Sequence, residues 1–110
     1  MSRRALQEPT FLILTALAAG AQHGYGIMSD VGKISDGRVK LRAGTLYAAL
    51  DRLDAENLIE ADREEIVDGR LRRYYRLTGA GAQRLAAEVE RLQAQTTVAA
   101  RRLDLMGGTA

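Results

Sequence analysis

With 110 residues the chain can build one small hydrophobic core, so we expect a single domain with at most one appended element. The absence of cysteine excludes disulfide bridges and thiolate metal sites, and it fits the reducing cytoplasm. The net charge of only +2 says little by itself about nucleic acid as a partner. The longest apolar run, residues 11–19, is too short to cross a membrane, and no cleavable leader pattern follows Arg3 and Arg4, so no membrane partner is expected.

Two helices are predicted at the N-terminal end. The first begins at Glu8-Pro9-Thr10, because proline lacks an N–H group that the first helical turn leaves unbonded anyway, and Gly20 closes it. Its side chains are apolar around most of the circumference, which indicates a central helix. After a turn over residues 21–24, apolar residues at helical spacing predict a second helix that ends near Ser35. These residues are Ile27, Val31 and Ile34.

A third helix and a hairpin follow a turn at Asp36-Gly37 and a brief extended piece at residues 39–41. The helix runs from about Arg42 to Glu56, and Asn57 suits the left-handed conformation that ends helices. Its buried face carries Leu46, Leu50 and Leu53. Residues 58–66 and 71–77 are predicted to be strands, since Asp68-Gly69 between them is typical of a tight hairpin turn.

The last predicted element is a helix from Thr78 to about Leu105, roughly 40 Å long at a rise of 1.5 Å per residue. Its larger side chains alternate spacings of three and four, which is a heptad seam. The seam consists of Ala82, Leu85, Val89, Leu92, Thr96, Ala99, Leu103 and Met106. Such a helix overhangs the core, so we expect it to pack on its own copy in a homodimer, and also on the first helix of the other subunit because Thr96 and Ala99 supply little apolar area.

The predicted order of elements gives a mainly α fold with a small β-hairpin (α+β). We expect a winged helix-turn-helix at residues 1–77, a C-terminal dimerisation helix at residues 78–106 and a flexible tail at residues 107–110. In such a fold one helix enters the major groove of DNA and the wing grips phosphate.

The third helix is the candidate recognition helix. Gly44 would let the backbone approach the duplex, Thr45 and Tyr47 offer hydroxyl groups, and Arg52 can reach phosphate or guanine. Amphipathic helices are common, so the helix alone is as consistent with plain core packing. Near the start of the second helix, Tyr25 offers a hydroxyl to phosphate between glycines that would let the helix begin close to the DNA backbone.

The hairpin shifts the balance towards DNA, because four arginines gather there: Arg70, Arg72, Arg73 and Arg76. Only Lys33 and Lys40 of the 16 basic residues are lysine, and the arginine fork binds phosphate oxygens and base edges in pairs. A solvated basic face remains an alternative. Acids on the facing strand and at the turn could also neutralise the arginines across the hairpin, namely Asp62, Glu64, Glu65 and Asp68.

Nothing in the sequence indicates catalysis, because no nucleophile motif and no phosphate-binding loop after a strand is present. We therefore expect no enzyme, no catalytic residue and no cofactor. His23 is the only histidine and builds no metal site alone, so it is interpreted as structural or as a phosphate donor at a helix start, and no metal is expected.

Several motifs over residues 8–92 together resemble the PadR family of bacterial transcriptional regulators, in its shorter branch with a single C-terminal helix. The motifs are Glu8-Pro9-Thr10-Phe11, His23-Gly24-Tyr25-Gly26, Gly44-Thr45-Leu46-Tyr47 with Leu50 and Leu53, Gly69-Arg70, Tyr74-Tyr75-Arg76-Leu77-Thr78, and Gly81. The chain departs from many members at Ala48, where proline is frequent, and at Asn57, where glycine is frequent. It also lacks the tryptophan with which some relatives stack planar ligands, which argues against an aromatic sandwich here.

The resemblance implies a homodimeric repressor of a pseudo-palindromic operator in double-stranded DNA that a small-molecule effector releases. Together with the pattern, it gives the candidate DNA-binding residues Tyr25, Arg42, Gly44, Thr45, Tyr47, Ala48, Arg52, Gly69, Arg70, Arg72, Arg73 and Tyr74. The candidate dimerisation residues are Leu85, Val89, Leu92, Thr96, Ala99 and Leu103. Two rivals stay open: a protein–protein adaptor that uses the winged domain as a scaffold, and a small-molecule-binding or enzymatic dimer with an apolar groove.

Overall fold

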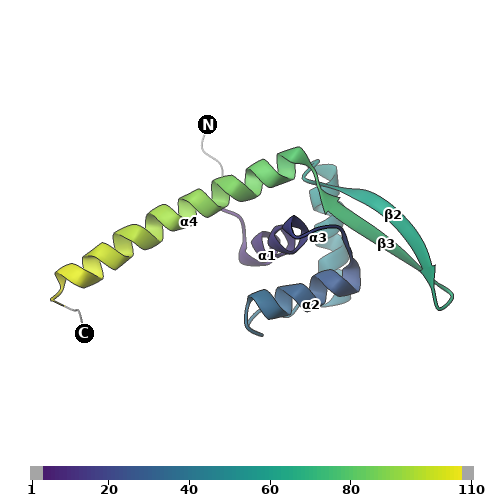
Figure 1. Cartoon of the computed structure of the whole chain (residues 1–110), viewed down its shortest axis with the longest axis horizontal. Helices are drawn as coiled ribbons and strands as arrows, with labels where there is room; N and C mark the ends of the chain where they lie inside the picture. Colours follow the sequence, from purple (N-terminus) through teal and green to yellow (C-terminus); the bar gives the residue numbers. More distant parts are fainter. Residues whose placement is uncertain (1–3, 108–110) are drawn as a thin grey trace.

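The computed structural model describes residues 4–107 and contains four helices and a three-stranded antiparallel sheet. In chain order the elements are α1 (Glu8–Ala18), β1 (Gln22–His23), α2 (Gly24–Ile34), α3 (Ala43–Ala55), β2 (Ile59–Val67), β3 (Arg70–Leu77) and α4 (Gly79–Leu105). The β2–β3 hairpin projects from one end of the helical body and α4 from the other (Figure 1). The expected winged helix-turn-helix with a long C-terminal helix is confirmed.

The core is centred on α1, as its all-round apolar character predicts. Its buried side chains contact the apolar faces of α2 and α3, and the sheet closes the remaining side with Ile59 and Tyr75. The α1 residues are Leu12, Ile13, Leu14, Ala16 and Leu17, and their partners include Ile27, Val31, Leu46, Leu50 and Leu53. The leucine spacing of the third helix therefore marked the buried face correctly.

Two turn predictions are confirmed by backbone angles. Asp68 and Gly69 both have positive φ, 51° and 76°, which is the condition for the tight turn that matches the twist of a hairpin. Asn57 has φ 62° and lies one residue before Leu58, whose N–H donates to the carbonyl of Leu53 at 3.0 Å. Local chemistry thus fixes where α3 ends and where the wing reverses.

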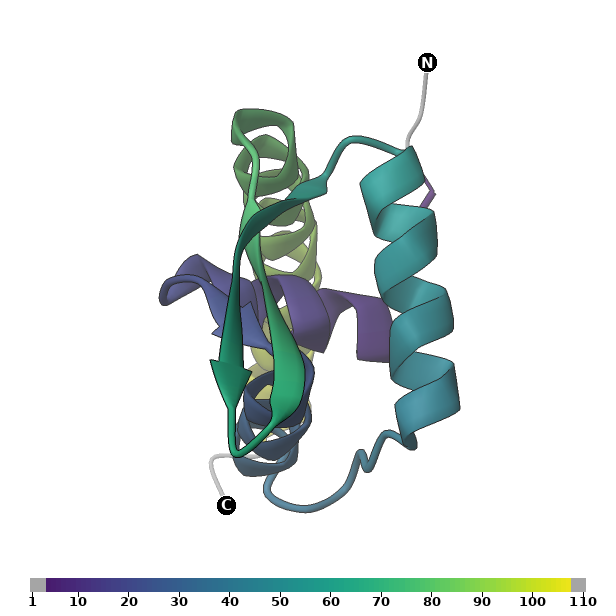
Figure 2. The ribbon, with the colours of Figure 1, turned by 90° about the vertical axis from the view of Figure 1, so that its right-hand side faces the viewer.

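The turn predicted over residues 21–24 was incomplete, because it contains the short strand β1. Gln22 pairs with Tyr75 and His23 with Tyr74, so the sheet order is β1-β3-β2 and β3 is central. A two-residue strand is too short to show alternation in a sequence. The pairing ties the start of α2 to the wing, which faces the viewer in Figure 2.

Within residues 4–107, helix α4 contacts the other elements through its first half. Thr78 caps its start by accepting a hydrogen bond from the N–H of Gly81 at 2.9 Å, and Leu85 packs against the core. Within the chain α4 also contacts α1, and the expected packing on the partner's first helix stays a prediction. From residue 93 onwards every described residue is exposed.

Among residues 4–107 no helix is both long and apolar enough to traverse a bilayer. The expected flexible tail falls on residues 107–110, of which 108–110 lie outside the described residues.

Candidate nucleic-acid interface

An open groove of about 670 Å³ separates the start of α2 and Tyr47 of α3 from the wing. Tyr25 and Tyr47 lie on one side, exposed by 74% and 46%, and Arg70 and Arg72 lie on the other. Arg73 also lines the groove, so five of the predicted DNA-binding residues, from three separate elements, meet at one surface. Phenolic hydroxyls and guanidinium groups are donors suited to phosphate oxygens.

Gly24 forms part of this surface because Tyr47 packs against it. A Cβ atom at position 24 would lie 2.3 Å from the hydroxyl oxygen of Tyr47 and 2.9 Å from its ring carbon Cζ. Gly24 is buried, so its lack of a side chain makes room for Tyr47. The expected approach of the glycine backbone to DNA stays a prediction.

His23 holds α2 and the sheet in place. Its Nδ1 accepts a hydrogen bond from the N–H of Gly26 at 3.2 Å, and its ring meets the ring of Tyr74 edge-on with centroids 5.2 Å apart. Burial lowers the pKa of His23, the charge of Arg72 lowers it further, and Glu65 opposes the shift. The neutral imidazole is thus a helix cap, which supports the structural interpretation of this residue.

The wing arginines divide into two pairs. Arg73 bonds Glu64 at 2.9 Å and Arg76 bonds Glu60 at 2.7 Å, and in both cases the partners stand opposite each other in the register of β2 and β3. Arg70 and Arg72 form no ion pair with any residue between 4 and 107. Neutralisation across the hairpin, which the sequence left open, therefore applies to two of the four arginines.

Tyr74 is engaged inside the wing by its neighbours. Its ring lies between His23 and Arg63, whose guanidinium carbon is 3.9 Å from the ring centroid. Arg63 falls at a β-bulge between Ala61 and Glu64, where the strand carries one extra residue, and the sequence did not mark it. Tyr74 is half-buried and stiffens the base of the wing.

The remaining residues predicted on α3 line a second cavity, of about 430 Å³, beside α1. Gly44, Thr45 and Ala48 are exposed there, and the guanidinium of Arg52 donates to the hydroxyl of Thr10 at 3.0 Å. A Cβ atom at Gly44 would meet no heavy atom within 4 Å. The structure thus places these residues on the flank of α3 away from the groove that Tyr47 lines.

The start of α3 carries the exposed residue Arg42 at its N-cap and has no side-chain cap, so its first N–H groups lack that partner. Gly69 lies at the tip of the wing, with no heavy atom within 4 Å of a Cβ atom at that position.

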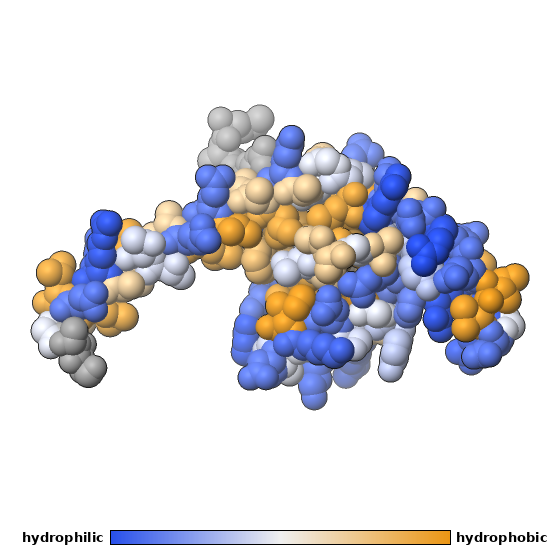
Figure 3. All heavy atoms as spheres, viewed as in Figure 1, coloured by the Kyte–Doolittle hydropathy of each residue, from blue (hydrophilic) through white to orange (hydrophobic). Residues whose placement is uncertain are grey.

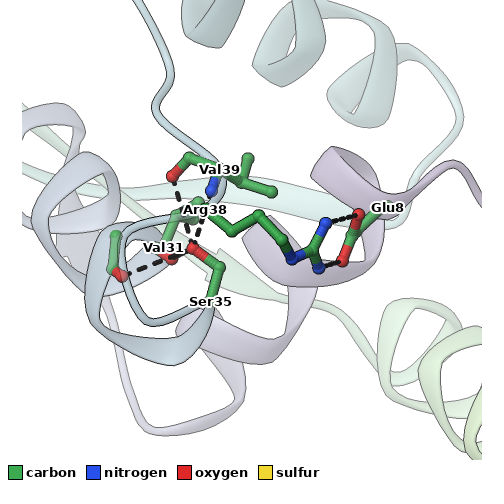
Figure 4. A network of polar contacts seen from close by, with 6 residues as sticks. Glu8, Val31, Ser35, Arg38 and Val39 are labelled. Carbon is green, nitrogen blue, oxygen red and sulfur yellow. Dashed lines mark hydrogen bonds and ion pairs between the residues drawn. The ribbon is translucent and has the colours of Figure 1, made fainter.

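The connection between α2 and α3 is anchored by contacts that the sequence did not predict (Figure 4). Arg38 binds both carboxylate oxygens of Glu8 at the start of α1, one of them at 2.9 Å. Ser35 donates to the carbonyl of Val31 at 2.9 Å and accepts from the N–H of Val39 at 3.0 Å. These bonds fix the turn between the two helices against α1.

The chain is similar to regulators of known sequence and structure. The profile of the Transcriptional regulator PadR-like family matches residues 13–87. Transcriptional regulator Rv3488 of Mycobacterium tuberculosis is 41% identical over 81 residues, which cover 74% of this chain and 72% of that protein. A PadR family transcription regulator from Clostridium difficile superposes with a TM-score of 0.72 at 25% identity, covering 93% of this chain and 100% of its own. Bacillus subtilis PadR, solved in complex with operator DNA, superposes with a TM-score of 0.67 at 25% identity, covering 76% of this chain and 47% of its own.

Proposed function

Since the chain belongs to the PadR-like family of transcriptional regulators, we propose that it is a homodimeric repressor that binds a pseudo-palindromic DNA operator in the cytoplasm. The observation that carries this proposal is the groove at which Arg70 and Arg72, free of ion pairs within residues 4–107, face Tyr25 and Tyr47. Two unneutralised arginines beside two exposed phenols form a surface for a polyanion. The operator complex of Bacillus subtilis PadR supports DNA as that polyanion.

Helix α4 is the proposed dimerisation element. Val89, Val98 and Leu103 are exposed by 36%, 46% and 62%, and apolar side chains gather at the free end of the helix (Figure 3). Large apolar groups on an overhanging helix favour burial against a second copy. In the dimer, each α3 enters one major groove, and successive grooves on one face of DNA lie about 34 Å apart.

We place effector relief at the junction of α1 and α4. A cavity of about 240 Å³ lies there, and its lining includes Leu6, Phe11 and Leu92. A small molecule that enters this cavity would rotate α4 relative to the winged domain, so the two α3 helices of the dimer would no longer match successive major grooves.

The test is a gel-shift assay of the purified protein on its own upstream DNA, with native mass spectrometry to count subunits and duplexes. We expect one dimer per duplex and a weaker shift with an effector found in a panel of small molecules. A protein that stays monomeric at micromolar concentration and ignores duplex even in dilute buffer contradicts the proposal. A dimer that captures no duplex would favour the adaptor function instead.

Base recognition by α3 is tested by Thr45→Ala, because Thr45 is exposed near the start of the helix. If its hydroxyl reads a base edge, affinity falls at one or two operator positions by about 1–3 kcal/mol each and stays unchanged elsewhere. A uniform loss over all positions would make Thr45 a phosphate contact.

A further inference from the structure

Glu88 is a charged residue buried in the middle of α4, with 2% of its surface exposed. A carboxylate in such a place is costly unless charges and hydrogen bonds compensate for the lost water. Glu88 lies beside the heptad seam, at a position that the sequence pattern left unassigned. The burial of this carboxylate therefore needs a structural explanation.

The partners of Glu88 come from two elements. On α4, Arg84 donates to Oε1 at 3.3 Å and Arg91 binds Oε2. Ahead of α1, the backbone N–H of Leu6 donates to Oε2 at 3.3 Å. Arg84 also donates to the carbonyl of Arg4, so the carboxylate and its arginines clamp α4 to the segment that precedes α1. Arg91 holds the pKa of the Glu88 carboxyl below its ordinary value, so the clamp is charged near neutral pH.

The clamp follows an earlier close contact of α4. This contact is at the start of the helix, where a Cβ atom on Gly81 would lie 1.9 Å from the carbonyl oxygen of Leu58. Glu88 lies two turns later, and every described residue of the chain beyond residue 92 is exposed. Leu105 lies about 25 Å beyond Glu88 along the axis at 1.5 Å per residue, so a tilt of about 8° moves it by about 3.5 Å. That distance is close to the ~3.4 Å that separates successive base pairs.

We propose that Glu88 is a positioning residue that fixes the direction of α4 relative to the winged domain and thereby sets the spacing between the two operator half-sites. This inference rests on the proposed function for its DNA part. Glu88 lies far from the proposed DNA-binding surface, yet it would help to determine which operators the protein binds.

The first experiment measures the direction of α4 without DNA. The chain has no cysteine, so Asp51→Cys on α3 and Arg101→Cys on α4, both exposed, accept a pair of spin labels. Pulsed electron resonance gives their distance distribution in the otherwise unchanged protein, with Glu88→Gln, and with Glu90→Gln. Glu90 is an exposed glutamate of the same helix, so its change is a matched loss of one charge. Arg101 lies about 20 Å beyond Glu88 along the axis, so the tilt above moves it by about 2.7 Å. We expect Glu88→Gln to shift or broaden the distribution by about 2–3 Å, and Glu90→Gln to leave it unchanged.

The second experiment measures operator spacing. Duplexes carry the two half-sites at separations that differ by one base pair, and binding is followed by fluorescence anisotropy. The unchanged protein and Glu90→Gln should lose about tenfold in affinity one base pair from the optimum. Glu88→Gln should move the optimum or lose less than about threefold, while its affinity for a single half-site stays within about twofold.

An unchanged label distance or an unchanged spacing profile in Glu88→Gln overturns the inference. If Glu88→Gln fails to fold, Arg91→Lys replaces it, because lysine keeps the charge and loses the fork. The same broadening is then expected, and its absence also overturns the inference. A wild-type protein that binds no duplex refutes the proposed function and the spacing claim, whereas the label distances still decide whether Glu88 orients α4.

Discussion

Replacing Arg72 by alanine should weaken binding to all duplexes alike and reduce its dependence on salt. Arg72 lines the groove opposite Tyr25 and forms no ion pair within residues 4–107, so its charge is available to a phosphate. Arg73, the next residue along β3, bonds Glu64 at 2.9 Å and is the matched control. The two variants remove the same charge one residue apart.

The size of the effect follows from counterion release. Each phosphate contact contributes about 0.9 to the slope of log affinity against log salt, so the loss of Arg72 from both subunits of a dimer flattens the slope by about 1.8. Between 50 and 200 mM salt the unchanged protein should therefore lose about 12-fold more affinity than Arg72→Ala does. Arg73→Ala should change the slope by less than half of that amount, because its guanidinium is already bonded to Glu64.

Fluorescence anisotropy titrations of operator and scrambled duplexes at several salt concentrations give both slopes. Equal slopes for Arg72→Ala and the unchanged protein would mean that Arg72 contacts no phosphate. An equal flattening by Arg72→Ala and Arg73→Ala would mean that the Arg73–Glu64 ion pair opens on DNA. Both arginines would then contact phosphate, and the distinction between a free Arg72 and a paired Arg73 would be wrong.

Three further predictions concern the scaffold of the site. Gly24→Ala should lower the affinity for DNA and change the melting temperature little, because the half-exposed Tyr47 can turn away from the new methyl group and so leave the groove. A lower melting temperature with unchanged affinity would contradict this. Gly81→Ala should destabilise the fold by about 2 kcal/mol or more, since the methyl group meets the backbone carbonyl of Leu58, and a melting temperature lowered by less than about 5 °C would refute it. Burial lowers the pKa of His23 in the folded chain, so its contribution to stability is complete above its ordinary value of 6.5 and is lost as the pH falls through the lower folded value. Urea unfolding between pH 5 and 8 should show this dependence, and His23→Asn, which keeps a capping acceptor but does not titrate, should reduce it.

The sequence predicted those parts of the fold that local chemistry decides. Asp68-Gly69 and Asn57 need left-handed backbone, and few other residues adopt it at little cost. The spacing of the leucines in α3 alone indicates which face of the helix is buried. Strand β1 was missed because its pairing with β3 depends on a contact about 50 residues away in the chain.

The candidate site was predicted in its composition and only partly in its arrangement. Tyr25, Tyr47 and Arg70 do meet at one groove, as a winged helix-turn-helix implies. The pairing of Arg73 with Glu64 follows the register that the Asp68-Gly69 turn sets, whereas the pairing of Arg76 with Glu60 depends on the bulge between Ala61 and Glu64, which shifts the register by one residue. The clamp at Glu88 lay beyond prediction for a similar reason, since a glutamate on a long helix is ordinarily solvated.

The sheet order β1-β3-β2 leaves β2 as the outer edge of a wing that extends into solvent. An open edge invites the strands of other molecules to add to it and begin a fibril. Five charged side chains occupy β2, namely Glu60, Asp62, Arg63, Glu64 and Glu65, so an added antiparallel copy would bring their like charges close together. The acids that reduce the net positive charge of the wing thus also disfavour polymerisation of the DNA-free protein through the same wing.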